Sequence, residues 1–227
     1  MIITDIHKRL FSLRDEKYAQ FSAKLIPGFS QEYFIGVRTP QLKSLTREIV
    51  REGNYDEFLE SLPHRFFEEN LLHAFILATE KLPIEATVAR VDLFLPYIDN
   101  WAVCDQFSVK IFGRYQEILY PLIKKWLRSD HTYTRRFAIV NSMRFFLDEK
   151  FTPGMLDDVA RATTDHYYIR MCVAWYFATA LAKQWSDTIP YIEQRILPAD
   201  VHKKTIRKAI ESFRITAEQK AYLRQLS

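Results

Sequence analysis

Apolar residues recur every three or four positions along most of this chain, and no stretch shows the sustained alternation of a half-buried strand. Prolines interrupt this pattern where helices are expected to begin or end. Thr39-Pro40, for example, has the form of an N-cap residue followed by proline at the first helical position. The pattern predicts helices over residues 3–13, 15–25, 39–52, 54–62, 64–82, 84–97, 100–113, 116–129, 131–148, 153–163, 166–184, 187–196, 199–213 and 216–226.

The spacing of these helices indicates a repeat. From residue 39 onward they pair into units of about 40–45 residues, which is the period of HEAT-type repeats. The inner helix of each pair is expected at residues 66–82, 101–112, 133–146 and 168–185. Such pairs cannot bury their apolar faces alone and therefore stack. We predict an all-α fold, a solenoid of stacked antiparallel helical pairs (HEAT-like repeats, an α–α superhelix), as one domain over residues 1–227 with a concave surface.

The composition agrees with a folded helical protein. Only five of the 227 residues are glycine, which leaves few sites for the tight turns of hairpins and barrels. Hydrophobic residues make up 48%, which excludes a disordered chain. No apolar run approaches the roughly 20 residues that span a bilayer, and residues 1–5 lack the features of a secretion signal. We expect a cytoplasmic monomer without a membrane partner.

Nothing in the sequence predicts a metal or an organic cofactor. Cys104 and Cys172 lie in apolar surroundings without the paired spacing of a zinc or redox motif, so we expect both to be core residues. The six histidines are scattered and form no known metal-binding spacing. The net charge of +4 is compatible with a polyanionic partner but does not identify one.

Four residues on the predicted inner helices suggest a functional cluster. Trp101 and Asp105 are four positions apart and should share one helical face. Arg136 follows Asp105 by 31 residues, and Trp175 follows Arg136 by 39, so equivalent turns of neighbouring repeats should lie side by side. We predict that the four side chains gather on the concave surface. The alternatives are a structural ion pair between Asp105 and Arg136, and a buried core position for Trp175.

These residues also carry a family resemblance. The Trp-x-x-x-Asp at 101–105, the Arg-x-Ala-Ile at 136–139 and the helix of Trp175 resemble the catalytic-pocket motifs of the AlkD family of HEAT-like repeat DNA glycosylases. Residues 36–40, Gly-Val-Arg-Thr-Pro, resemble a marker that precedes the first repeat, and the similarity extends over nearly the whole chain. The resemblance implies binding to duplex DNA and hydrolysis of the N-glycosidic bond of purines alkylated at N3 or N7, without base flipping.

The chemistry that the resemblance implies fits these residue types. An N3- or N7-alkylated purine is cationic and leaves as a neutral base, so a single carboxylate can suffice where other glycoside hydrolases use two. Asp105 would stabilise the oxocarbenium sugar and orient the attacking water. Trp101 and Trp175 would present π faces to the cation, and Arg136 would hold a phosphate beside the lesion.

Further basic residues could follow the DNA backbone. Lys110 and Arg135 lie among the central repeats, and a later helix begins with Lys203, Lys204 and Arg207, which together could clamp a phosphate. The alternative for each of them is an ordinary solvated charge. In family members, a helix ahead of the marker enters the minor groove.

In this chain the corresponding segment, residues 25–36, contains Pro27 and Gly28. Proline costs about 3 kcal/mol in a helix interior and glycine about 1 kcal/mol, so we predict a turn and no helix through 25–30. The segment also lacks basic residues between Lys24 and Arg38. We therefore expect the minor-groove anchor to be absent, DNA binding to be weakened, and base excision to be weak or abolished.

Two other functions remain open from the sequence. The first is a catalytically inactive relative that binds DNA weakly or binds branched DNA, as the altered segment suggests. The second is a HEAT-type protein-interaction scaffold, which predicts a concave face lined by exposed apolar residues instead of basic ones.

Overall fold

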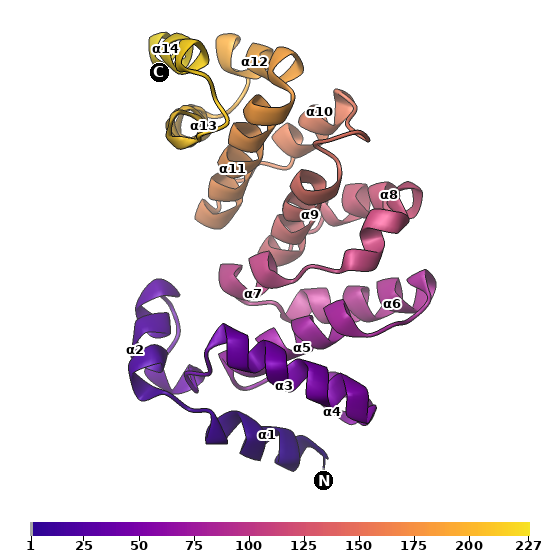
Figure 1. The fold of residues 1–227 in the computed structure, drawn as a ribbon. Coiled ribbons are helices and arrows are strands. Elements are labelled where there is room, and N and C mark those ends of the chain that lie inside the picture. The colour runs from indigo at the N-terminus through magenta and orange to yellow at the C-terminus, as the bar shows by residue number, and fades with distance from the viewer. Residues whose placement is uncertain (1) are drawn as a thin grey trace. The chain divides into compact units, whose positions relative to one another are not determined.

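The computed structural model describes residues 2–227, and all regular structure within them is helical (Figure 1). No strand occurs in this part of the chain, which confirms the predicted all-α class. The α-helices are α1 (Ile2–Ser12), α2 (Glu16–Leu25), α3 (Thr39–Glu52), α4 (Asp56–Glu60), α5 (Phe67–Thr79), α6 (Ile84–Phe94), α7 (Trp101–Gln106), α8 (Gln116–Trp126), α9 (Thr132–Phe145), α10 (Gly154–Arg161), α11 (Tyr167–Lys183), α12 (Trp185–Glu193), α13 (Ala199–Glu211) and α14 (Ala217–Gln225). The short 3₁₀ helices are η1 (Gln31–Tyr33), η2 (Leu95–Tyr97) and η3 (Lys110–Arg114).

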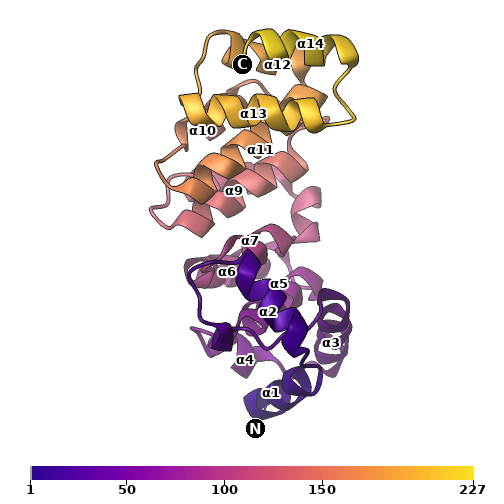
Figure 2. The same cartoon turned by 90° about the vertical axis from the view of Figure 1, so that its left-hand side faces the viewer.

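The chain forms two compact units, Met1–Ile111 and Phe112–Ser227. In the first unit, α5 packs between α3 and α7. In the second, α11 packs between α9 and α13 (Figures 1 and 2). Helix α8 packs against α9 (Figure 1). Neighbouring helices thus form pairs that stack on one another, which agrees with the predicted solenoid of helical pairs. No helix among residues 2–227 has the length and apolar character needed to cross a bilayer.

One predicted helix, residues 100–113, is wrong in its second half. Helix α7 ends at Gln106, and the backbone of Phe107 is extended, with φ −73° and ψ 99°. The Phe107 side chain is completely buried and meets Phe94 edge-to-face, with ring centroids 5.7 Å apart. An extended residue at this point turns the ring into the core, and the chain then resumes as the separate 3₁₀ helix η3, which begins at Lys110.

The loop ahead of α3 is fixed by a buried carboxylate. Gly36 has φ +95°, and a Cβ atom at this position would lie 2.0 Å from the backbone oxygen of Asp15. The amides of Ile35, Gly36 and Val37 donate hydrogen bonds of 2.9, 2.7 and 3.2 Å to the carboxylate of Glu68 on α5. The Gly-x-x-Thr-Pro marker therefore has a structural role, since it fastens the start of α3 to α5.

The segment between α2 and α3 contains the predicted turn. Helix α2 ends at Leu25, Gly28 follows with φ +99°, and the short helix η1 precedes the marker loop. The prediction that no helix runs through residues 25–30 is confirmed. The Tyr33 ring stacks on Phe29 with centroids 4.4 Å apart within the segment, and the Phe34 ring meets Phe67 of α5 with centroids 5.3 Å apart, which holds the segment against α5.

Candidate functional site

The beginning of α7 is held by a chain of hydrogen bonds. The Asn100 side-chain oxygen accepts the amides of Ala102 and Val103 at 3.0 Å each, which caps the helix. The Asn100 side-chain amide donates to Asp99 at 2.7 Å, and the Tyr33 hydroxyl donates to the same carboxylate at 2.6 Å. Burial and the neighbouring Asp99 raise the pKa of Tyr33, so its hydroxyl stays a neutral donor. The first turn of α7 is therefore held firmly in place.

Trp101 and Asp105 stand at the first and fifth positions of this helix, and both are half-buried. The three residues between them, Ala102, Val103 and Cys104, are buried. Because residues four apart lie on the same side of a helix, α7 packs one side into the core and presents an indole and a carboxylate together on the other. The spacing argument for this pair agrees with the geometry of the first unit.

Arg136 lies on α9 in the second unit and is only 6% exposed. Its guanidinium donates a 2.7 Å hydrogen bond to the backbone carbonyl of Tyr168, at the beginning of α11. Arg136 therefore joins two neighbouring inner helices, and it is more deeply buried than a residue on an open concave surface would be.

Trp175 lies on α11 with 38% of its surface exposed, whereas the adjacent Ala174 and Tyr176 are completely buried. Its indole therefore reaches the surface of the second unit and is not a core side chain. Trp101 and Asp105 belong to the first unit, and Arg136 and Trp175 belong to the second. The gathering of all four side chains into one cluster stays a prediction.

The remaining predicted DNA-binding residues differ in whether neighbouring groups of the protein already bind their side chains. In Arg135, Nε donates to the Ser129 carbonyl at 3.0 Å and a terminal nitrogen donates to the Ala162 carbonyl at 3.4 Å. This guanidinium joins the loops before α9 and after α10. Lys110, by contrast, is exposed at the start of η3.

The basic residues of α13 are partly compensated by carboxylates. Lys204 lies 3.4 Å from Asp200, and Arg207 donates to Glu211 at 3.2 Å. Lys203 is exposed. Surface pairs of this kind contribute little to stability and exchange readily with other anions, so they leave α13 able to meet a phosphate.

Two basic residues that the sequence reasoning missed lie on α3. Lys43 and Arg47 are exposed, and together with Lys110 they line a groove of about 450 Å³ in the first unit. Their spacing of four residues was the available signal, since it places both charges on one side of a helix.

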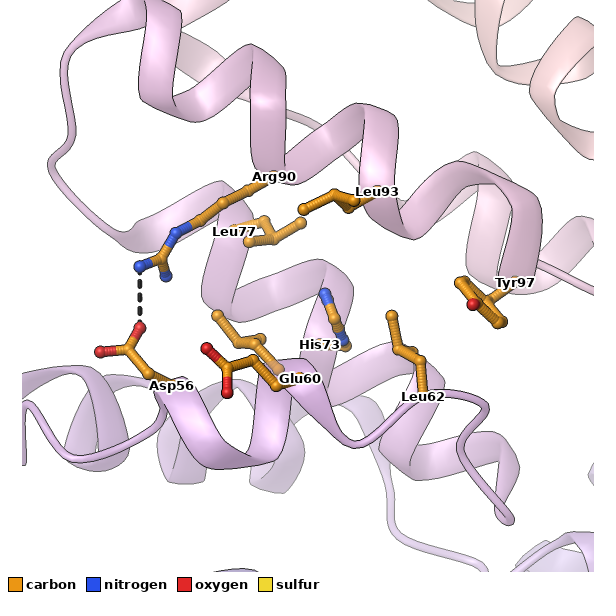
Figure 3. A pocket seen from close by; sticks show the side chains of 9 residues that line it. Asp56, Glu60, Leu62, His73, Leu77, Arg90, Leu93 and Tyr97 are labelled. Carbon is orange, nitrogen blue, oxygen red and sulfur yellow. Dashed lines mark hydrogen bonds and ion pairs between the residues drawn. The ribbon is translucent and has the colours of Figure 1, made fainter.

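A second cavity of the first unit, of about 360 Å³, lies between α4, α5 and α6 (Figure 3). Leucines form much of its lining, and Arg90 pairs with Asp56 at 2.7 Å on one side. His73 lies in its wall with its Nδ1 2.9 Å from Nε2 of His64. Burial lowers the pKa of His64 to about 4 and also lowers that of His73, so both imidazoles are neutral at pH 7. None of the predicted site residues lines this cavity.

Among the described residues 2–227, no group of three or more His, Cys, Asp or Glu side chains is arranged to hold a metal ion. A family model described as DNA alkylation repair enzyme matches residues 6–213 of the chain. This range contains every predicted catalytic and DNA-binding residue. A search of curated proteins finds no match.

Proposed function

Because this chain belongs to the DNA alkylation repair enzyme family, we propose that it binds duplex DNA and hydrolyses the N-glycosidic bond of cationic N3- or N7-alkylpurines without flipping the base. The observation that carries this proposal is the shared face of Trp101 and Asp105 on a firmly capped helix. A carboxylate held beside an indole suits a reaction that develops positive charge on a sugar.

Asp105 is the residue to which we assign the reaction. The alkylated base carries a positive charge and leaves as a neutral molecule, so its departure needs no proton donor. As the bond from the sugar to the base breaks, the sugar becomes an oxocarbenium ion that a nearby carboxylate stabilises. The same carboxylate orients a water molecule, accepts its proton and lets its oxygen bond to the sugar carbon.

The two indoles and Arg136 assist this step by binding the substrate. The faces of Trp101 and Trp175 attract the cationic sugar or base, which is worth about 0.5–2 kcal/mol each. Arg136 holds a phosphate that flanks the lesion and so fixes the register of the DNA. Its bond to the Tyr168 carbonyl orients the guanidinium before DNA arrives.

The remaining cations supply affinity that does not depend on sequence. Lys110, Lys203 and Lys204 would neutralise backbone phosphates and release the counterions bound to them, and Arg135 and Arg207 would add to this contribution. Binding should then weaken steeply as the salt concentration rises.

The test is release of free 7-methylguanine or 3-methyladenine from methylated duplex DNA. We expect Asp105→Asn to lower the rate of release at least about 10-fold, since it removes one electrostatic stabiliser. Glu85→Gln is the matched control, because Glu85 is an exposed carboxylate on α6 of the same unit. No release by the wild-type protein at high concentration would overturn the excision proposal.

One observation favours a second candidate function, a catalytically inactive relative that binds DNA weakly or binds branched DNA. Between Ile26 and Arg38 the only helical element is the single turn η1, and the chain there has no basic residue. This supports the expectation that no element here grips the minor groove near the lesion. Salt-dependent binding to duplex or four-way junction DNA, without release of base, would establish this alternative.

A further inference from the structure

The groove beside α3 combines three basic residues from different parts of the first unit. Lys43 and Arg47 come from α3, and Lys110 comes from the start of η3. The groove encloses about 450 Å³ and is also lined by Thr79, Gln106 and Ser108. No carboxylate lines it. Its charge is therefore positive throughout, and its neutral polar groups can donate hydrogen bonds.

The three cations lack compensating partners. Within residues 2–227, neither Lys43, Arg47 nor Lys110 forms an ion pair. Two arginines of the same unit are neutralised by contrast: Arg9 contacts Glu48 and Glu52, and Arg90 contacts Asp56 and Glu80. Like charges four residues apart on a helix repel by a few tenths of a kcal/mol. An anion in the groove would remove this repulsion.

The packing of the unit positions these charges. The Lys43 ammonium lies 5.3 Å from the centroid of the buried Phe75 ring on α5, which holds it against the groove wall. Lys110 reaches the groove because α7 ends at Gln106 and the chain runs through buried Phe107 and Val109 before η3 begins. A continuous helix over residues 100–113 would direct Lys110 differently, so the break in the helix helps to form the groove.

We propose that this groove, which neither Trp101 nor Asp105 lines, binds phosphates of the DNA backbone. This inference rests on the DNA binding proposed above and adds Lys43 and Arg47 to it. The groove offers charge and hydrogen-bond donors, and its one aromatic ring, Phe75, is 5% exposed and covered by Lys43. A base has no open ring on which to stack, so the groove should recognise the backbone and not a base.

A different role for the same cations is to offset the negative ends of α5 and α7, which finish at Thr79 and Gln106 beside the groove. The two roles predict different measurements. If the cations bind phosphates, they contribute to the salt dependence of DNA affinity. If they compensate the helix ends, they contribute to the free energy of unfolding.

The experiment measures binding of a fluorescent, unmodified 20-base-pair duplex across a range of salt concentrations. We expect Lys43→Gln/Arg47→Gln to reduce the magnitude of the negative slope of log affinity against log salt by about 2, and addition of Lys110→Gln to reduce it by about 3 in total. Lys8→Gln/Lys81→Gln is the control, since both lysines are exposed in the same unit, outside the groove. The control should keep the wild-type slope.

The outcomes separate this inference from the proposed function. If the wild-type protein binds with a clear salt slope and the groove variants keep that slope, the groove does not bind DNA, whereas the proposed function stands. If the variants lose unfolding free energy but keep the slope, the cations serve the helix ends and the inference is overturned. If the wild-type protein shows no salt-dependent binding, DNA binding itself fails and the inference fails with it.

Discussion

The buried carboxylate of Glu68 accepts a 2.7 Å hydrogen bond from the backbone amide of Gly36, and it also accepts the amides of Ile35 and Val37. Burial raises the pKa of this carboxyl group, and the three amides act in the opposite direction. One side chain on α5 thus satisfies three consecutive donors of the loop that leads into α3.

We predict that Glu68→Gln destabilises the protein substantially. Glutamine has one acceptor oxygen, and its amide group would face backbone amides that need an acceptor. Each buried donor left unsatisfied costs roughly 1–3 kcal/mol. Chemical denaturation of the variant should show this loss, and Glu85→Gln at an exposed position should show almost none. An unchanged denaturation midpoint would mean that the loop is held by other contacts.

Gly36→Ala tests the backbone of the same loop. The new Cβ atom would lie 2.0 Å from the Asp15 oxygen, and the φ of +95° already disfavours any L side chain. We expect a loss of more than about 1 kcal/mol in the free energy of unfolding. Gly154→Ala is the matched control, because nothing lies within 4 Å of its Cβ position and it begins α10. The control should be neutral or slightly stabilising.

The helices could be predicted because their ends are determined locally. Helix α3 begins within one residue of the predicted position, although the N-cap is Arg38, without a side-chain cap hydrogen bond, and not the predicted Thr39. Pro40 is therefore the second helical residue, and the helix ends before Gly53, which adopts φ +78°. The break at Phe107 could not be predicted in this way. The apolar spacing of residues 100–113 suits a helix, and the contact of Phe107 with Phe94 overrides that local preference. Contacts between distant segments are not visible in local periodicity.

The candidate site, too, could be predicted from the sequence only where local spacing determines it. The common face of Trp101 and Asp105 follows from their spacing alone, as the structure of α7 bears out. The repeat period gave the helix that carries Arg136 but not how deeply its side chain is buried, because burial depends on the fit of α9 against α11. Lys43 and Arg47 were missed because single surface charges on a helix ordinarily face solvent, and only the groove distinguishes them.

Stability should fall as the solution is acidified below about pH 6.5. His64 and His73 lie 2.9 Å apart and stack on Phe58 and Phe94, with centroids 4.5 and 3.8 Å apart respectively. Burial lowers the pKa of His64 to about 4 and also lowers that of His73. The unfolded chain therefore binds protons at a higher pH than the folded chain, and acid favours unfolding.

The loss should appear between about pH 6.5 and pH 4. For His64 alone it amounts to roughly 3 kcal/mol over this range, at about 1.4 kcal/mol for each pH unit. Urea denaturation at pH 7 and at pH 5 measures the part of this loss that falls above pH 5, about 2 kcal/mol. The double variant His64→Leu/His73→Leu should show a weaker dependence on pH than the wild-type protein. An equal dependence in both proteins would show that other groups cause it.

Trp175 and Trp126 provide a test that separates a role in DNA binding from a role in folding. Trp126 is 2% exposed and meets Phe137 at 5.4 Å between ring centroids, so Trp126→Ala should cost about 3–5 kcal/mol of stability. Trp175 is 38% exposed, and Trp175→Ala should cost clearly less, because a smaller part of its surface leaves water on folding.

If Trp175 presents its π face to a cationic sugar or base, its removal should slow base release by about 2- to 30-fold, which corresponds to 0.5–2 kcal/mol. The measurement pairs thermal denaturation with the release assay for the two variants. A loss of release in Trp175→Ala without a comparable loss of stability supports contact with DNA. If Trp175→Ala instead destabilises the protein as much as Trp126→Ala, then Trp175 is a packing residue, and its assignment to the reaction is overturned.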